Sequence, residues 1–170
     1  MKIKMKAIAI LLSLVVLSGI AVASACSTRT PGYWKNHDWP TMNSPFSYYD
    51  WATGRTVTWT LPSWFTVTTL QTPVRGDAKI NLEQKVISAI LSIKMDNREG
   101  WTLPGHYTNG PFNGKVLPDL ITDALNLIKN NNGPWTPGSA AANSGVRAQG
   151  LALASAIDYW LNYYDEAPII

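Results

Sequence analysis

Prolines and aromatic rings crowd the stretch from residue 31 to residue 65, and this crowding most constrains how the chain can fold. Five of the eight tryptophans lie there, interspersed with Pro31, Pro40, Pro45 and Pro62. Each proline lacks a backbone donor and clashes with the preceding helical turn, so the stretch excludes a long helix. Beyond residue 77 the apolar residues recur at helical spacing instead. We therefore predict a mainly α domain with two parts, an aromatic arm over residues 26–76 and a helical part over residues 77–170.

The helical part is predicted to contain three amphipathic helices, at about 80–95, 117–129 and 145–164. In the first, one candidate N-cap is Asn81, with Gln84 as its capping partner, and the other is Asp77, which would cap the helix from Ala78 onward. Its apolar residues form one stripe along the helix, and Ile87 and Leu91 widen this stripe. The members of the stripe itself are Leu82, Val86, Ala89, Ile90 and Ile93. A face this broad predicts burial on more than one side, in a domain resembling a three-helix bundle.

The arm has one segment with strand periodicity. From Arg55 to Leu61, threonines alternate with apolar residues, which is typical of a half-buried strand. Pro62-Ser63 can turn the chain, and Phe65 to Leu70 would then supply a second strand. The sequence therefore leaves room for a short β-hairpin in the arm, built from these two segments.

The first 25 residues have the pattern of a secretory signal. Three lysines, Lys2, Lys4 and Lys6, precede an uncharged run from Ala7 to Ala25 that ends in Ala23-Ser24-Ala25. A basic start, an apolar centre and small residues at the end are the parts of such a signal. We predict that residues 1–25 are a signal peptide and that residues 26–170 form a single exported domain, secreted or held at the cell surface. The alternative is an uncleaved run that anchors the protein in the membrane.

Cys26 is the one cysteine of the chain and directly follows the expected cleavage point. One interpretation makes it the lipid acceptor of a lipoprotein, although Ala23 stands where such signals usually carry leucine. The other leaves it free, or paired with a second chain. Apart from a retained anchor, a lipidated Cys26 is the only predicted route to a membrane.

The charge of the exported part excludes one class of partner. The whole chain carries 14 lysines and arginines against 11 acidic residues, but three of the lysines precede residue 26. Eleven positive charges then face eleven negative ones. A domain without net charge lacks the electrostatic footprint that a phosphate backbone requires, so we expect no nucleic acid partner.

Near the start of the exported part, the chain reads Thr30-Pro31-Gly32-Tyr33-Trp34-Lys35-Asn36-His37. This segment resembles the "TPGYWKNH" motif of a family of secreted bacterial and archaeal modules. A weaker match, Thr72-Pro73-Val74-Arg75-Gly76-Asp77-Ala78, is similar to the turn that precedes an alanine-rich helix in that family. The resemblance implies an exported domain of a family without an established activity. It also implies further cysteines in many members, and this chain has none of them.

The motif supplies the candidate binding site of the arm. Two hypotheses compete for its residues: a polar site rimmed by tryptophans, or aromatic core residues whose polar neighbours cap the backbone. Stacking of sugar rings on aromatic faces is a further option, with Trp59 and Trp64, or Trp34 and Trp39, as the candidate pairs. The candidate binding residues of the motif are Tyr33, Trp34, Lys35, Asn36, His37 and Trp39.

Catalytic, metal and cofactor signatures are missing from the sequence. It has no G-x-S-x-G or H-E-x-x-H motif, and its two histidines, His37 and His106, lie far apart. The carboxylates that could pair for hydrolysis, Asp38, Asp50, Asp77 and Glu83, form no recognisable motif. We therefore predict no metal site, no cofactor and a non-enzymatic interaction or structural role, with a cell-surface protein or a polysaccharide as partner. The alternative is a secreted protein that binds or cleaves polysaccharide through the arm, using His37, Asp38 and nearby tryptophans.

Overall fold

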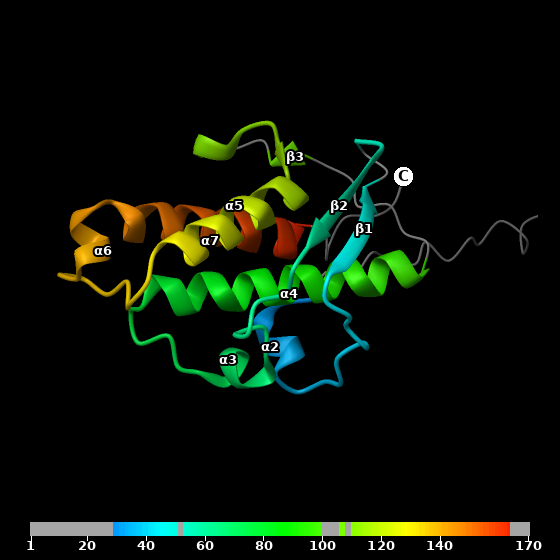
Figure 1. The fold of residues 1–170 in the computed structure, drawn as a ribbon, viewed down its shortest axis with the longest axis horizontal. Helices are drawn as coiled ribbons and strands as arrows, with labels where there is room; N and C mark the ends of the chain where they lie inside the picture. Colours follow the sequence, from blue (N-terminus) through cyan, green and yellow to red (C-terminus); the bar gives the residue numbers. More distant parts are fainter. Residues whose placement is uncertain (1–28, 51–52, 100–105, 108–109, 164–170) are drawn as a thin grey trace, which may run out of the picture.

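The computed structural model describes residues 29–50, 53–99, 106–107 and 110–163 (Figure 1). The expected signal peptide and Cys26 lie outside these residues. The elements are α2 (Pro31–Trp34), β1 (Phe46–Asp50), β2 (Arg55–Trp59), α3 (Val67–Gln71), α4 (Ala78–Glu99), β3 (His106–Tyr107), the 3-10 turn η1 (Gly110–Phe112), β4 (Lys115–Val116), α5 (Leu117–Asn130), α6 (Ala140–Asn143) and α7 (Val146–Tyr163). The mainly α class is confirmed. Among the described residues, no helix combines the length and the apolar character needed to cross a membrane.

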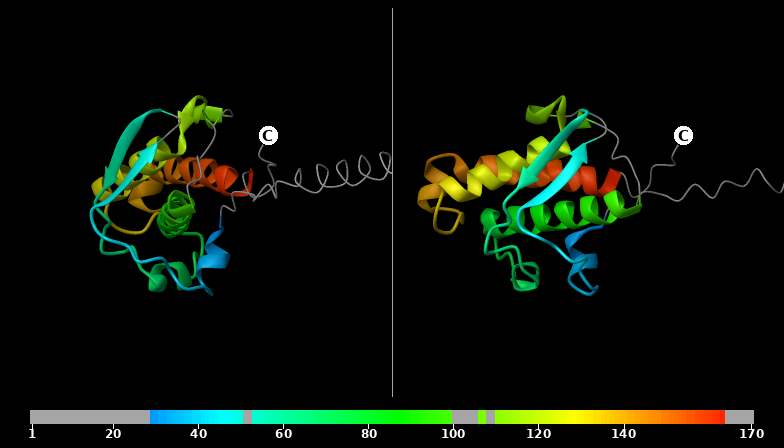
Figure 2. Two further views of the ribbon diagram at one scale, coloured as in Figure 1. Left: turned by 90° about the vertical axis from the view of Figure 1, so that its right-hand side faces the viewer. Right: turned by 45° about the vertical axis from the view of Figure 1, so that its right-hand side comes forward.

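Helix α4 is the central element of the fold. In Figures 1 and 2, α5 and α7 lie on one side of it, and the short helices α2 and α3 lie on the opposite side. Val86 and Ile90 belong to the main core shared with α5 and α7, whereas Ile87 and Leu91 form a second core with Trp34 and Leu70. The prediction that the broad apolar face of this helix is buried on more than one side is confirmed.

Of the two candidate N-caps of α4, the structure uses Asp77. Asn81 lies inside the helix, and the cap is Asp77, whose carboxylate accepts a hydrogen bond from the backbone N–H of Lys79 at 2.8 Å. The same carboxylate oxygen accepts from the backbone N–H of Trp135 at 3.0 Å. A side chain acts as an N-cap when its acceptor lies close to backbone N–H groups that have no other partner. For Asp77, one of these N–H groups belongs to the first turn of α4 and the other to a distant loop. Asp77 therefore fixes both the helix and the loop that leads to α6.

Gln84 also has a different role from the predicted one. Its side-chain amide donates to the carbonyl oxygens of Thr69, Leu70 and Thr72, at 3.0, 3.2 and 2.7 Å. These carbonyls lie at the end of α3, where a short helix leaves its last acceptors without partners. Gln84 therefore holds α3 on the surface of α4 rather than completing a capping box.

The arm contains a hairpin, but the predicted second strand is wrong. β2 pairs antiparallel with the preceding segment β1, in a register that places Phe46 opposite Trp59 and Tyr48 opposite Val57. The predicted partner, Phe65 to Leu70, is mostly the helix α3. Its threonines form that helix locally, because the Thr66 hydroxyl accepts from the backbone N–H of Thr69 at 3.2 Å.

Helices α5 and α7 lie within one residue of their predicted bounds. Pro118 stands in the first turn of α5, as expected for proline at a helix start. Gly150 of α7 is buried, and the indole of Trp135 occupies the space beside it that a larger residue would fill. The three long helices α4, α5 and α7 contact each other in pairs around the main core.

Candidate functional site

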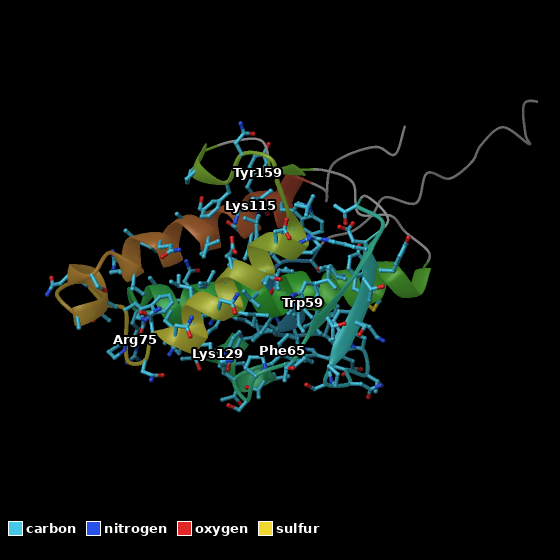
Figure 3. The ribbon with its side chains drawn as sticks, turned by 45° about the horizontal axis from the view of Figure 1, so that its top comes forward. Trp59, Phe65, Arg75, Lys115, Lys129 and Tyr159 are labelled. Carbon is cyan, nitrogen blue, oxygen red and sulfur yellow. The ribbon has the colours of Figure 1, made fainter. Side chains whose placement is uncertain are left out.

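A groove of about 430 Å³ lies between the end of the hairpin and α5. Figure 3 shows Trp59 and Lys129, two of its lining residues, on the same side of the molecule as Phe65. The arm contributes one wall of the groove and α5 contributes the other, so segments far apart in the sequence build one surface. The lining residues are Thr58, Trp59, Thr60, Pro62, Trp64, Thr122, Leu125, Asn126 and Lys129.

Trp59 is the fixed wall of this groove. The hairpin register places its ring beside that of Phe46, with 6.0 Å between the ring centroids. Its indole N–H donates to the hydroxyl of Thr122 on α5 at 3.0 Å, and that hydroxyl donates to the carbonyl of Pro118 at 2.8 Å. The indole is 4% exposed. Trp59 therefore ties the arm to α5 and has a rigid orientation.

Trp64 is the aromatic residue of the groove that keeps accessible surface. It is half-buried and contacts residues of both cores. Its backbone carbonyl accepts a hydrogen bond from the Thr69 hydroxyl at 2.6 Å, which connects the segment before α3 to that helix. Because its ring packs against both cores, the rotamer of Trp64 is already restricted, and the half-buried indole can contact a ligand at little entropic cost.

Polar groups around the two indoles are neutral, with one exception. Thr58, Thr60 and Asn126 are exposed and offer hydroxyl and amide groups that both donate and accept hydrogen bonds. Lys129, in the last turn of α5, supplies one ammonium group. None of the described lining residues carries a carboxylate. The groove thus combines apolar ring surface, neutral hydrogen-bonding groups and a single positive charge.

The motif that the sequence singled out lies on the opposite side of α4 from α5 and α7. Trp34 is 1% exposed and packs against Leu70, Ile87 and Leu91, so its ring has no face for a ligand. Trp39 is half-buried; its indole N–H donates to the carbonyl of Trp34 at 3.0 Å. These two tryptophans have the packing expected of the core hypothesis.

The polar residues of the motif contact their own backbone. His37 Nδ1 donates to the carbonyl of Tyr33 at 2.8 Å, and the two rings stack with centroids 3.7 Å apart. The Asn36 amide donates to the carbonyl of Gly32 at 3.2 Å. Lys35 is the half-buried C-cap of α2. Asn36 and His37 are exposed, so binding through this part of the motif stays a prediction.

Both tryptophan pairs that were candidates for sugar stacking lie close in space, and each contains one buried and one half-buried ring. Only Trp59 and Trp64 line the groove. Sequence reasoning did not identify their partners on α5, Thr122, Asn126 and Lys129. Polar residues on the outer face of an amphipathic helix are ordinary, and no sequence signal distinguishes those opposite a hairpin from those facing water. Only the packing of the arm against α5 could select them.

The candidate carboxylates do not form a catalytic pair at the groove. Asp38 is exposed on the arm, whereas Asp50 is buried and accepts from the hydroxyl of Thr53. Asp77 is the cap described above. Within the described part of the chain, no three histidine, cysteine or acidic side chains lie close enough to hold a metal ion. The side chain of His106, one of the two histidines, lies outside the described residues.

Glu83 has a shifted pKa. It lies on α4 and is 8% exposed. The pKa of Glu83 is raised to about 7, mainly because burial disfavours its charged form; Lys79 lowers this pKa and the carboxylate of Asp77 raises it. Glu83 does not line the groove, so its shifted pKa bears on stability rather than on binding.

We expect stability to depend on pH through Glu83. Because the folded state binds this proton more tightly than the unfolded state, Glu83 lowers the free energy of unfolding as pH rises from about 4.5 to about 7. Glu83→Gln should remove that dependence and stabilise the protein above pH 7, by on the order of 2 kcal/mol. Urea denaturation of both proteins at pH 5 and pH 8 measures it. If the free energy of unfolding falls by the same amount from pH 5 to pH 8 in the wild type and in Glu83→Gln, the pH dependence does not come from Glu83.

Comparison of the chain with protein-family models, curated proteins and solved structures gave no match. The likeness of the Thr30–His37 segment to secreted modules is therefore still a prediction made from the motif alone.

Proposed function

We propose that this protein is a non-enzymatic, exported binding module, secreted or at the cell surface, and that the groove between the hairpin and α5 binds a polysaccharide. The observation that carries the proposal is the composition of that groove. The half-buried Trp64 and the fixed Trp59 line the same groove, together with hydroxyl and amide groups. Sugar rings have apolar faces bordered by hydroxyl groups, and this arrangement complements both features.

Binding is favoured over cleavage by the same lining. Glycoside hydrolysis ordinarily needs two carboxyl groups on either side of the scissile bond. The described lining residues include none. The helices α4, α5 and α7 act in this proposal as a bundle-like scaffold that fixes α5, and the arm adds the second wall.

A general interaction role through the motif is the competing form of the proposal. Asn36 and His37 are exposed and stand at the end of α2, away from the groove. A protein partner could contact them without using the groove. The two forms predict different effects of mutation and can be separated in one series of variants.

The groove can be blocked without disturbing the core. Asn126 is exposed on α5 and lines the groove, so Asn126→Trp should fill it; Gln149→Trp, at an exposed position of α7 outside the groove, is the matched control. We expect the wild type and the control to bind the same members of a glycan array. Asn126→Trp should lose at least tenfold in affinity, as should Trp64→Ala if circular dichroism shows that it is folded.

Three results would decide against the groove. Unchanged glycan affinity in Asn126→Trp would place the binding surface elsewhere. Loss of binding in His37→Ala, with Asn126→Trp unaffected, would assign it to the motif. An array on which the wild type binds no glycan would overturn the polysaccharide proposal.

A further inference from the structure

Lys129 is the one charged residue among the described residues that line the groove, and this position distinguishes it from Lys35 and Arg75, whose side chains also have no ion pair with a described residue. It is exposed in the last turn of α5. No hydrogen bond or ion pair joins its ammonium group to another described residue. By contrast, Arg55, Lys85 and Lys115 each pair with an aspartate, namely Asp119, Asp158 and Asp123.

The carboxylates of α5 do not offset this charge. Asp119 and Asp123 are one turn apart, and each already pairs with a cation outside the groove. The other residues of α5 that line the groove are Thr122, Leu125 and Asn126, and all three are uncharged. An exposed ammonium group that lines a groove with otherwise neutral polar groups attracts an anion, and salt screens that attraction.

A stabilising role in the helix does not account for where the lysine lies. Lysine in the last turn of a helix interacts favourably with the helix dipole, an effect of a few tenths of a kcal/mol up to about 1 kcal/mol. That interaction would be satisfied on any face of α5. Here the residue lies on the face that lines the groove, at one end of the surface that includes Trp64.

From this arrangement we infer that the ligand is an acidic polysaccharide, whose sugar carries a carboxylate or sulfate group that binds Lys129 while a ring packs on Trp64. The inference rests on the proposed function, because it names the substrate class of the same groove. Direct contact between an ammonium group and a carboxylate or sulfate gives a charge-assisted hydrogen bond in addition to ring packing. Lys129 is then a specificity residue and Trp64 the main affinity residue.

The test compares matched acidic and neutral sugars on the folded exported protein. The probes are oligogalacturonate with its methyl ester, oligoglucuronate with cello-oligosaccharide, and sulfated with unsulfated galactan fragments. Affinities are measured by calorimetry at low and high salt. We expect an acidic member to bind about five- to tenfold more tightly than its neutral counterpart at low salt, with a smaller difference at high salt.

Variants assign this preference to one residue. Lys129→Gln should abolish the preference for the acidic member of each pair, whereas Lys129→Arg should retain it. Arg75→Gln, which removes an equal charge from an exposed position outside the groove, should have no effect. A carboxylate-only or a sulfate-only preference identifies the anion, and either supports the inference.

Failure of the inference and failure of the proposed function give different results. Equal affinity for acidic and neutral sugars, or a preference that survives Lys129→Gln, overturns the inference and leaves the groove as a site for neutral polysaccharide. Absence of binding to every acidic and neutral member overturns both.

Discussion

Replacing Trp34 with alanine is expected to lower the free energy of unfolding by about 3–5 kcal/mol, the usual effect of deleting a fully buried aromatic side chain. Trp34 is 1% exposed and packs with Leu70, Ile87 and Leu91 in the second core. This core holds α2 and α3 on α4, so the cavity would lie where three elements meet. Urea denaturation followed by circular dichroism measures the effect.

Trp34→Phe is the matched control for this variant. The indole N–H of Trp34 is buried and donates to no acceptor in the part of the chain that the structure describes. Phenylalanine keeps much of the ring volume and removes that unsatisfied donor, so we expect a change of less than about 1.5 kcal/mol. A loss below about 1 kcal/mol in Trp34→Ala would show that the second core contributes little to stability. It would also reopen a binding role for this tryptophan.

The second large effect is expected from Gly150→Ala in α7. Alanine is ordinarily favoured over glycine inside a helix by about 1 kcal/mol. A Cβ atom at Gly150, however, would lie 2.7 Å from Cζ3 and 2.8 Å from Cε3 of Trp135, whose side chain is fully buried. Because the indole has no free space to move into, we expect overpacking to win, with a net loss of about 2–3 kcal/mol.

A double-mutant cycle with Trp135 separates overpacking from other causes. In a Trp135→Leu background the clash is relieved, so Gly150→Ala should cost much less there, and the two substitutions should be strongly non-additive. Gln149→Ala, at the neighbouring exposed position, should change the free energy of unfolding by less than about 0.5 kcal/mol. If Gly150→Ala stabilises the wild-type protein, the indole of Trp135 does not pack closely against Gly150.

The partner of strand β2 and the N-cap of helix α4 are two features that sequence patterns could not predict uniquely. Alternation predicted the β2 strand, but it could not identify the partner, because β1 contains three aromatic residues and the segment after Pro62 contains aromatic and β-branched residues, and both kinds favour strands. The choice between the two candidate N-caps of α4 stayed open for a related reason. Asn81 and Asp77 are both good caps, and Asp77 is used because its carboxylate also accepts from the backbone of Trp135.

The candidate site, too, could be predicted only in part from the sequence. Aromatic composition alone pointed to Trp59 and Trp64 as one of two stacking pairs. It could not show that the other pair includes Trp34, whose ring is buried. Nor could it associate the arm with Asn126 and Lys129, because a groove wall on α5 exists only when the hairpin packs beside that helix.

Sequence by itself determined the mainly α class, the approximate bounds of α4, α5 and α7, and the two-sided burial of α4. Those features follow from local rules, the 3.6-residue period and the prohibition of long helices by proline. The tertiary structure alone decided which strand pairs with β2, which side chains cap α4 and α3, which tryptophans keep accessible surface, and which residues of α5 face them. These depend on contacts between residues far apart in the chain, and such contacts leave no periodic trace in either segment.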